Sequence, residues 1–418
     1  MVSIRYAILM SSGDSTIRAL LIITAFAVTG LVTVMCEGNE RDGVMHPSGQ
    51  KFAGSASCYA CHEDIVSRHR NTPHFLTSQI ADTTTVLGSF EPGNNVVELN
   101  DILRIVMEKT SEGLFQRGVR RDSTIERQPF DITIGSGRQG QSYLYWHANS
   151  LYQLPASYYA PDSQWTNSPG YPTDQIVFNR PVTARCLECH STFFKTGRAV
   201  AQIETFDPKQ AVLGVDCERC HGPAASHVAF HTENPDVKEP RNIINPARLA
   251  RRQRLDNCAL CHSGIRKNFM PSFTFLVGDR LDDFSTPLYE ADSATTLDVH
   301  GNQYGLLTLS PCFRMSDMDC STCHDVHVRE TGNLRLFSKR CMDCHAPGTA
   351  DFCTLHETPG LVLEDNCIDC HMPKLPSKQV FVQASGNATR TPFFVRTHRV
   401  GIYRAQVEKF LEEEPTRR

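Results

Sequence analysis

A five-residue pattern, Cys-x-x-Cys-His, occurs seven times in this 418-residue chain and constrains its fold more than any other feature. Numbered one to seven along the chain, the motifs have first cysteines at Cys58, Cys186, Cys217, Cys258, Cys320, Cys341 and Cys367. The second cysteines are Cys61, Cys189, Cys220, Cys261, Cys323, Cys344 and Cys370, and the histidines are His62, His190, His221, His262, His324, His345 and His371. This spacing attaches a c-type haem through two thioethers, while the histidine ligates the iron from the proximal side. The sequence therefore predicts seven covalently bound haems.

Other uses of paired cysteines do not explain the pattern. A disulfide framework does not require a histidine after every second cysteine, and a zinc ribbon has no such rule. A thioredoxin-like redox site would show one Cys-x-x-Cys beside a βαβ pattern. The motifs leave three cysteines, Cys36, Cys312 and Cys353. Haem attachment of this kind takes place outside the cytoplasmic membrane, so we expect Cys312 and Cys353 to form a disulfide or to remain as two buried thiols.

The N-terminal segment has the features of an export signal. Arg5 and Arg18 precede an uncharged, mostly apolar run at 19–35, which is longer than a usual signal core. Cys36 follows the run directly and is a candidate for lipidation, although Met35 is not the small residue that a lipoprotein signal favours. Residues 1–36 are therefore predicted to be a signal peptide or a lipoprotein or membrane anchor. An uncleaved anchor is the alternative, since the run barely reaches a spanning length.

The motifs are spaced unevenly and divide the chain. Motif 1 stands alone, three motifs follow within 186–262, and three more lie within 320–371. We predict a first haem segment at 37–82, a β-rich insert at 83–180, a three-haem segment at 181–265, and a linking segment with a three-haem C-terminal region at 266–418. The expected fold is a mainly α and irregular multihaem cytochrome with a haem-packed core and a β-rich insert.

Local patterns predict individual elements. Alternating apolar residues indicate strands at 96–99, 103–108, 114–119, 130–134 and 141–146. A helix is expected to begin with Asn245 as its N-cap and Pro246 in the first turn, to run into Cys258, and to end at Gly264. The Gly-x-Gly-x-x-Gly at 135–140 is followed by another β pattern rather than a helix, so a dinucleotide site is not predicted there.

From His62 onward the chain resembles the multihaem cytochromes c grouped with the tetrahaem cytochromes of ammonia oxidation. That superfamily also includes hydroxylamine oxidoreductase and octahaem tetrathionate reductase. The resemblance covers roughly 55–400 and is carried by Thr72-Pro-His74-Phe75, Ile134-Gly135-Ser136, Gln141-Ser-Tyr-Leu144, Cys217-Glu-Arg-Cys-His-Gly-Pro223 with His227, His324-Asp-Val-His327, and His371-Met-Pro373. The resemblance implies that His74, His227 and His327 are distal iron ligands. The family includes both electron carriers and enzymes, so it does not choose between them.

Ten histidines lie outside the motifs, so seven irons could each receive a second one. After His74, His227 and His327, the next distal candidates are His356, His398 and His300. His46 is expected in a mobile segment, and His69, His147 and His231 at the surface or beside a ligand. An iron with two histidine ligands can only pass electrons, whereas an iron with an open distal site can bind and reduce a small molecule.

The predicted function is electron transfer along the haem chain, in the periplasm or at the surface of a bacterium, with membrane contact through the N-terminus. One alternative is a reductase or oxidase of a small nitrogen or sulfur compound at an open-site haem. Another is an electron-transfer subunit of a membrane-associated redox complex. The expected partners are redox proteins, such as a quinol-oxidising membrane complex or a terminal reductase. The formal net charge of −4 gives no indication of nucleic-acid binding. We assign no catalytic residue.

Overall fold

The computed structural model describes residues 43–286, 297–357, 363–386 and 389–413, apart from the side chains of 356, 357 and 413. Everything below concerns the compact unit Val44–Arg418. The predicted leader at 1–36, including Cys36, lies outside the described residues. Among the residues described, no helix is both long and apolar enough to cross a membrane.

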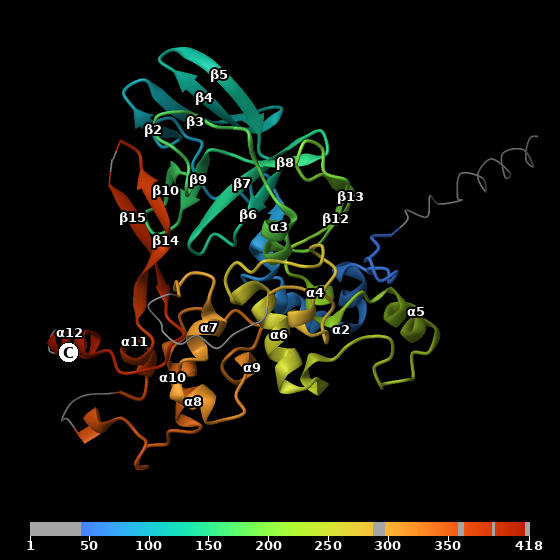
Figure 1. Cartoon of the computed structure of the whole chain (residues 1–418), viewed down its shortest axis with the longest axis vertical. Coiled ribbons are helices and arrows are strands. Elements are labelled where there is room, and N and C mark those ends of the chain that lie inside the picture. Colours follow the sequence, from blue (N-terminus) through green and yellow to red (C-terminus); the bar gives the residue numbers. More distant parts are fainter. Residues whose placement is uncertain (1–42, 287–296, 358–362, 387–388, 414–418) are drawn as a thin grey trace, which may run out of the picture. The chain divides into compact units, whose positions relative to one another are not determined.

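The largest element of this unit is an antiparallel sheet of nine strands (Figure 1). Its strands are β1 (Ser78–Ile80), β6 (Ile132–Ile134), β7 (Gly140–His147), β8 (Ser150–Gln153), β9 (Ala156–Tyr159), β10 (Gln164–Asn167), β11 (Arg180–Pro181), β14 (Lys374–Ala384) and β15 (Arg390–Arg396). The order is β1-β6-β7-β9-β10-β14-β15, with β8 paired to β7 and β11 paired to β8. The turn between β6 and β7 contains the glycine pattern at 135–140, and Gly135 and Gly137 both have positive φ there.

A four-stranded meander packs against this sheet. It consists of β2 (Val96–Asn100), β3 (Leu103–Thr110), β4 (Gly113–Arg120) and β5 (Ser123–Pro129). Burial alternates along β3, where Leu103, Ile105 and Met107 face inward, as expected for a strand with one covered face. One apolar cluster joins Ile105 and Met107 to Tyr143 of β7 and Trp165 of β10, so the two sheets share a core.

The remaining strands form a two-stranded hairpin, and the helices are short. The hairpin pairs β12 (Ser191–Thr196) with β13 (Phe206–Leu213). The α-helices are α2 (Ser55–His69), α3 (Ala184–His190), α4 (Cys217–His221), α5 (Ala225–Glu233), α6 (Arg251–His262), α7 (Gln303–Leu307), α8 (Pro311–Arg314), α9 (Cys320–Cys323), α10 (Leu334–Met342), α11 (Cys367–His371) and α12 (Arg404–Glu413). Single 3-10 turns are η1 (Phe75–Thr77), η2 (Pro246–Arg248), η3 (Leu281–Asp283) and η5 (Thr354–Glu357).

The expectation of a mainly α fold is wrong. Helix and strand each make up 27% of the structure, so the fold is that of a β-rich cytochrome. The predicted strands are found at β2, β3, β4, β6 and β7, but β14 and β15 were not expected. The β14–β15 hairpin joins the large sheet by pairing Thr166 with Ala384 and Asn167 with Gln383. Such pairing between distant segments depends on tertiary contacts rather than on local pattern.

The helix predicted from Asn245 is interrupted. The Asn245 side chain accepts a hydrogen bond from Ala247 N, as an N-cap should, but only the 3-10 turn η2 follows. Leu249 and Ala250 are extended, and α6 begins at Arg251. Gly264, with φ +78°, lies just beyond α6 as predicted.

Candidate haem centres

Each Cys-x-x-Cys-His motif lies on a short helical segment or at its end. A helical turn places residues i and i+3 on one side, so both thiols can reach one porphyrin edge. Polar caps start several of these turns: Asp216 caps α4, Asp319 caps α9, and Asn366 caps α11. The chain thus forms a separate turn for each haem instead of a long helix.

Hydrogen bonds at Nδ1 orient most of the motif histidines. His221 Nδ1 lies 2.9 Å from Ile244 O, His345 Nδ1 lies 3.0 Å from Asp351 O, and His371 Nδ1 lies 3.0 Å from Gly401 O. A carbonyl can only accept, so Nδ1 carries the proton in these rings and Nε2 is free to ligate iron. His190 and His262 make similar contacts through Nδ1, to Thr77 Oγ1 and Gln303 Oε1, each at 3.1 Å.

Four motif histidines face a second histidine at a separation that matches one iron. Two imidazoles on opposite sides of an iron, each bonded at about 2 Å, have ring centres about 6 Å apart. The observed centroid separations are 6.5 Å for His62–His227, 6.3 Å for His221–His327, 6.1 Å for His262–His74 and 6.2 Å for His324–His398. The residues present therefore fit six-coordinate haem iron at motifs 1, 3, 4 and 5.

These pairs exchange ligands between motifs. His74 lies near motif 1 in sequence but faces motif 4, and His227 follows motif 3 but faces motif 1. Burial lowers the pKa of His74 to about 4, with a further contribution from His262. Burial likewise lowers the pKa of His398 to about 4, with His324 as the next cause. Both rings are therefore neutral at physiological pH, the form in which imidazole binds a metal.

Motif 2 has a weaker indication of a partner. Burial lowers the pKa of His190 to about 4, and the charge of His300 is the next largest cause. Among the side chains described, no second histidine ring packs against His345 or His371. The side chain of the predicted ligand His356 lies outside the described residues, so its role stays a prediction.

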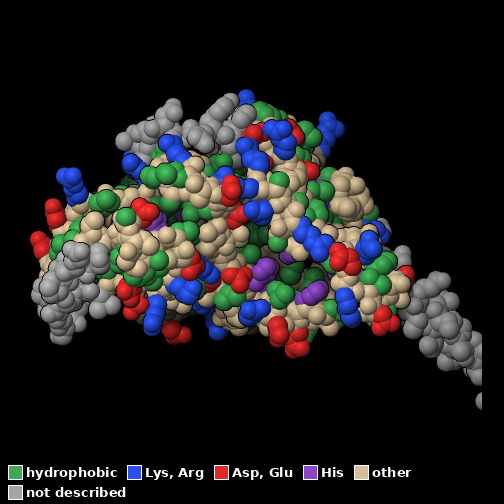
Figure 2. All heavy atoms as spheres, turned by 90° about the horizontal axis from the view of Figure 1, so that it is seen from below, with side chains coloured by type: hydrophobic (Ala, Val, Ile, Leu, Met, Phe, Trp, Pro, Cys, Tyr) green, Lys and Arg blue, Asp and Glu red, His purple; other side chains and the backbone are tan. Residues whose placement is uncertain are grey.

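The other histidines differ in their environments. His46 is buried, with only 4% of its surface exposed, and contacts Phe52 and Phe193 rather than lying in a mobile segment. His69 is buried 6.3 Å from His327, close to Asp216 and Cys217. His231 packs 4.6 Å from His227, and His147 packs against Tyr152. Figure 2 shows histidine side chains gathered in a hollow on one face of the molecule.

Contacts between cysteines of different motifs give the order of the centres in space. Three pairs of hydrogen-bonded thiols link different motifs. Cys58 of motif 1 pairs with Cys217 of motif 3. Cys189 of motif 2 pairs with Cys261 of motif 4, and Cys258 of motif 4 pairs with Cys320 of motif 5. Cys220 of motif 3 bonds Asn257, which is adjacent to motif 4. Arg340 of α10, directly before motif 6, donates to Cys323 O of motif 5, and Cys367 N of motif 7 donates to Ser338 Oγ of the same helix, so motifs 5, 6 and 7 are also neighbours. The order is 1-3-4-5-6-7, with motif 2 beside motif 4.

Charged side chains connect several of the same neighbours and also join motif 3 to motif 2. Arg219 of motif 3 donates to Glu188 O of motif 2, and Arg185 of motif 2 donates to Leu260 O of motif 4. Arg254 of α6 pairs with Asp319, the cap of motif 5. Two further arginines donate to backbone carbonyls inside a motif. Arg340 of α10 donates to Cys323 O of motif 5, and Arg396 of β15 donates to Ile368 O of motif 7. Sequence reasoning missed these links because nothing in a local pattern identifies the partner of an arginine.

Neither Cys312 nor Cys353 is part of a disulfide in the structure. Burial raises the pKa of Cys312, with Cys344 of motif 6 contributing. Cys353 influences the pKa of Cys367 and of Cys370, both in motif 7. A disulfide between them stays a prediction.

Comparison with known proteins gives one partial family match and one similar structure. A family model described as cytochrome c554 and c-prime matches residues 163–222, which contain motifs 2 and 3. The crystal structure of the outer cell wall cytochrome OcwA is similar with a TM-score of 0.49 and 15% identity, over 86% of this chain and 81% of that one. No curated protein matches the chain. With the motifs, the family match supports a c-type cytochrome with covalently bound haem iron that acts in electron transfer.

Proposed function

We propose that this protein is a seven-haem c-type cytochrome that passes electrons along the series 1-3-4-5-6-7, with haem 2 as a branch at haem 4. The observation that supports this proposal most strongly is the set of contacts between neighbouring motifs: the thiols of Cys58 and Cys217 and those of Cys258 and Cys320 are hydrogen-bonded, and Arg340 donates to Cys323 O. Short steps between neighbouring haems make one chain span the molecule. When bound, the haems supply the one-electron Fe(III)/Fe(II) chemistry.

The protein residues hold and orient these haems. The motif cysteines would hold the haems through thioethers, and the facing histidine pairs at motifs 1, 3, 4 and 5 would ligate their irons. His300 is the proposed second ligand at motif 2. Iron coordinated on both sides has no position for a substrate, which favours a carrier over an enzyme at these centres.

The proposed location is the periplasm or the cell surface of a bacterium, with redox proteins as partners. Covalent haem attachment outside the cytoplasmic membrane and the predicted export signal support this proposal. Lipidation at Cys36 or an uncleaved anchor would hold the protein at a membrane. Replacing Cys36 by Ser should release the protein from membranes if lipidation is the anchor. Unchanged retention with the N-terminal segment present would indicate the uncleaved anchor.

The alternative function concerns motifs 6 and 7, for which the described side chains assign no second ligand to pair with His345 or His371. An open iron there would make the protein a reductase or oxidase of a small nitrogen or sulfur compound. A low-temperature EPR spectrum of the oxidised protein separates the two functions. The carrier predicts low-spin haems throughout. A stoichiometric high-spin haem that binds nitrite, hydroxylamine or sulfite would instead establish the enzyme.

A further inference from the structure

The two residues between the cysteines of motif 3 include a deeply buried carboxylate. Glu218 is 3% exposed and accepts three backbone hydrogen bonds. Ala53 N and Ala224 N donate to Oε1 at 2.8 and 2.7 Å, and Gly54 N donates to Oε2 at 2.8 Å. Both carboxylate oxygens thus face donors, which is the arrangement that favours the anion.

These hydrogen bonds join motif 3 to motif 1. Ala53 and Gly54 directly precede α2, the helix that carries motif 1, so Glu218 binds the positive end of that helix. The thiols of Cys58 and Cys217 are neighbours at the same junction. The carboxylate therefore lies where the first and third haem attachment sites meet.

The charge of Glu218 is not balanced by an ion pair. All three of its hydrogen bonds come from backbone groups, and among the described residues no Lys, Arg or His forms a salt bridge with it. Burial raises the pKa of Glu218, and the three N–H groups oppose that effect. A second buried carboxylate, Asp216, lies two residues away and also accepts a backbone hydrogen bond, from Cys217 N. The adjacent Arg219 is directed toward Glu188 O of motif 2 instead.

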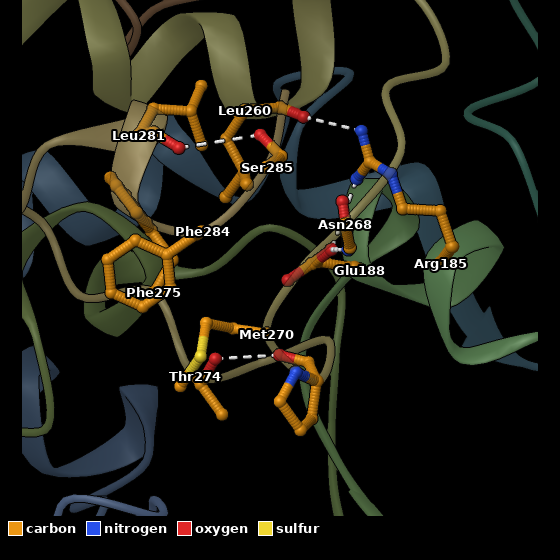
Figure 3. A pocket seen from close by; sticks show the side chains of 11 residues that line it. Arg185, Glu188, Leu260, Asn268, Met270, Thr274, Phe275, Leu281, Phe284 and Ser285 are labelled. Atoms are coloured by element: carbon orange, nitrogen blue, oxygen red, sulfur yellow. Dashed lines mark hydrogen bonds and ion pairs between the residues drawn. The ribbon is translucent and has the colours of Figure 1, made fainter. Parts of the chain in front are cut away.

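Motif 2 provides an internal contrast. Its Glu188 is equally buried, with 2% exposed, but Arg185 Nη1 lies 3.1 Å from its Oε2. Phe273 N donates to the other oxygen at 2.7 Å, and Arg185 continues to Leu260 O of motif 4 (Figure 3). The buried negative charge at motif 2 is therefore neutralised by a cation, whereas the charge at motif 3 is stabilised by dipoles alone.

An unbalanced negative charge affects the reduction of a nearby haem. Each iron that passes from Fe(III) to Fe(II) takes up one electron and loses one unit of positive charge. A buried carboxylate stabilises the more positive Fe(III) state, and this interaction is strong where water is excluded. We propose that Glu218 positions the first and third haems and makes this pair the low-potential end of the series, where electrons enter. This inference rests on the proposed function.

The test is a redox titration of the intact holoprotein, with dithionite as reductant, for the wild type and three variants. Glu218→Gln keeps the shape but removes the charge, and we expect the two lowest midpoint potentials to rise while the other five stay unchanged. Glu218→Asp keeps the charge, and its two lowest potentials should remain near those of the wild type. Glu63→Gln, an exposed carboxylate beside motif 1 that accepts a hydrogen bond from Tyr59, should leave all potentials unchanged.

The outcomes distinguish this inference from the proposed function. A wild-type protein with fewer than seven haems refutes the seven-haem series itself. With seven haems present, unchanged low-end potentials in Glu218→Gln overturn the role of Glu218. An equal rise in Glu218→Asp would also overturn it, because geometry rather than charge would then set the potentials. If Glu218→Gln loses haem, Glu218→Asp decides: retained low potentials support the role of the charge, and raised potentials reject it.

Discussion

The β region and the motif region of this protein are stabilised in different ways. The β region between β1 and β11 contains a continuous apolar cluster that includes Phe130, Tyr143, Leu154 and Trp165. The cluster around α6 holds only four buried apolar residues: Ala259, Leu260, Phe275 and Leu281. A region with so few buried side chains needs another source of core, and covalently bound haems are large apolar bodies that can provide it. We therefore expect the β region to fold on its own side chains and the region around α6 to depend on its cofactors.

The aromatic residues show how the β core is organised. Phe130 and Tyr143 have ring centroids 4.8 Å apart in an edge-to-face arrangement, and Trp165 lies 5.4 Å from Tyr143. Trp165 Nε1 also donates to Ser89 O at 2.7 Å, so its polar group is satisfied. Each such side chain contributes about 1.5–3 kcal/mol through burial, and aromatic pairs add about 0.5–1.5 kcal/mol.

Withholding haem should produce the largest effect. In protein made without haem attachment, we expect amide protection to be lost around α4, α6, α9 and α11, because the haem surfaces that complete their core are missing. Strands β3, β4 and β7 should remain protected. Hydrogen exchange followed by mass spectrometry measures both regions in one sample, with holoprotein as the reference. Equal loss of protection in both regions would show that the β region is not independent.

A cavity in the β core should destabilise the β region and leave the haem environment unchanged. Trp165→Ala should destabilise the β region by about 3–5 kcal/mol, since it removes a fully packed aromatic side chain. The haem absorbance bands should keep their positions. Thermal unfolding followed by near-ultraviolet circular dichroism reports the first effect, and haem absorbance reports the second. The matched control is Ile125→Ala on β5, where the side chain is 49% exposed and the expected change is within about 0.5 kcal/mol.

Removing one distal histidine should change one haem. His227→Ala opens the iron position opposite His62, so one low-spin haem should become high-spin and its potential should rise. EPR and redox titration measure these changes. His231→Ala is the control, because His231 contacts His227 at 4.6 Å but no contact places it against a motif histidine. The assignment of His227 fails if the two variants have the same spectrum.

Removal of the Arg254–Asp319 ion pair, which links α6 to motif 5, should give the smallest loss of stability, and this loss should depend on pH. Burial raises the pKa of Asp319, but hydrogen bonds from Ser321 and Arg254 outweigh it, so the folded-state pKa is below the ordinary value. A carboxyl group whose pKa is lower in the folded than in the unfolded protein stabilises the fold at pH values above its unfolded-state pKa. This stabilisation is lost as the pH falls through the folded-state pKa. Asp319→Asn should therefore cost about 1 kcal/mol near neutral pH. Denaturant unfolding should show this difference disappearing below about pH 4.

Most of the features that the sequence could predict are encoded in short local patterns. The seven motifs, the strands β2, β3, β4, β6 and β7, and the family-like histidines His74, His227 and His327 all depend on short patterns. The β14–β15 hairpin, the break at Leu249 and the buried position of His46 depend on tertiary contacts that no short pattern encodes. Glu218 could have been noticed as a charged residue inside a motif, but two of its three backbone donors, Ala53 and Gly54, come from a segment distant in sequence.

The most direct test of the account is the intact mass of the purified protein after denaturation in acid, which preserves thioether bonds. We predict the mass of the processed polypeptide plus seven haems, one for each motif, with all seven retained after acid–acetone extraction. A mass that corresponds to clearly fewer than seven haems would contradict the haem series and the role of the cofactors as the core of the motif region.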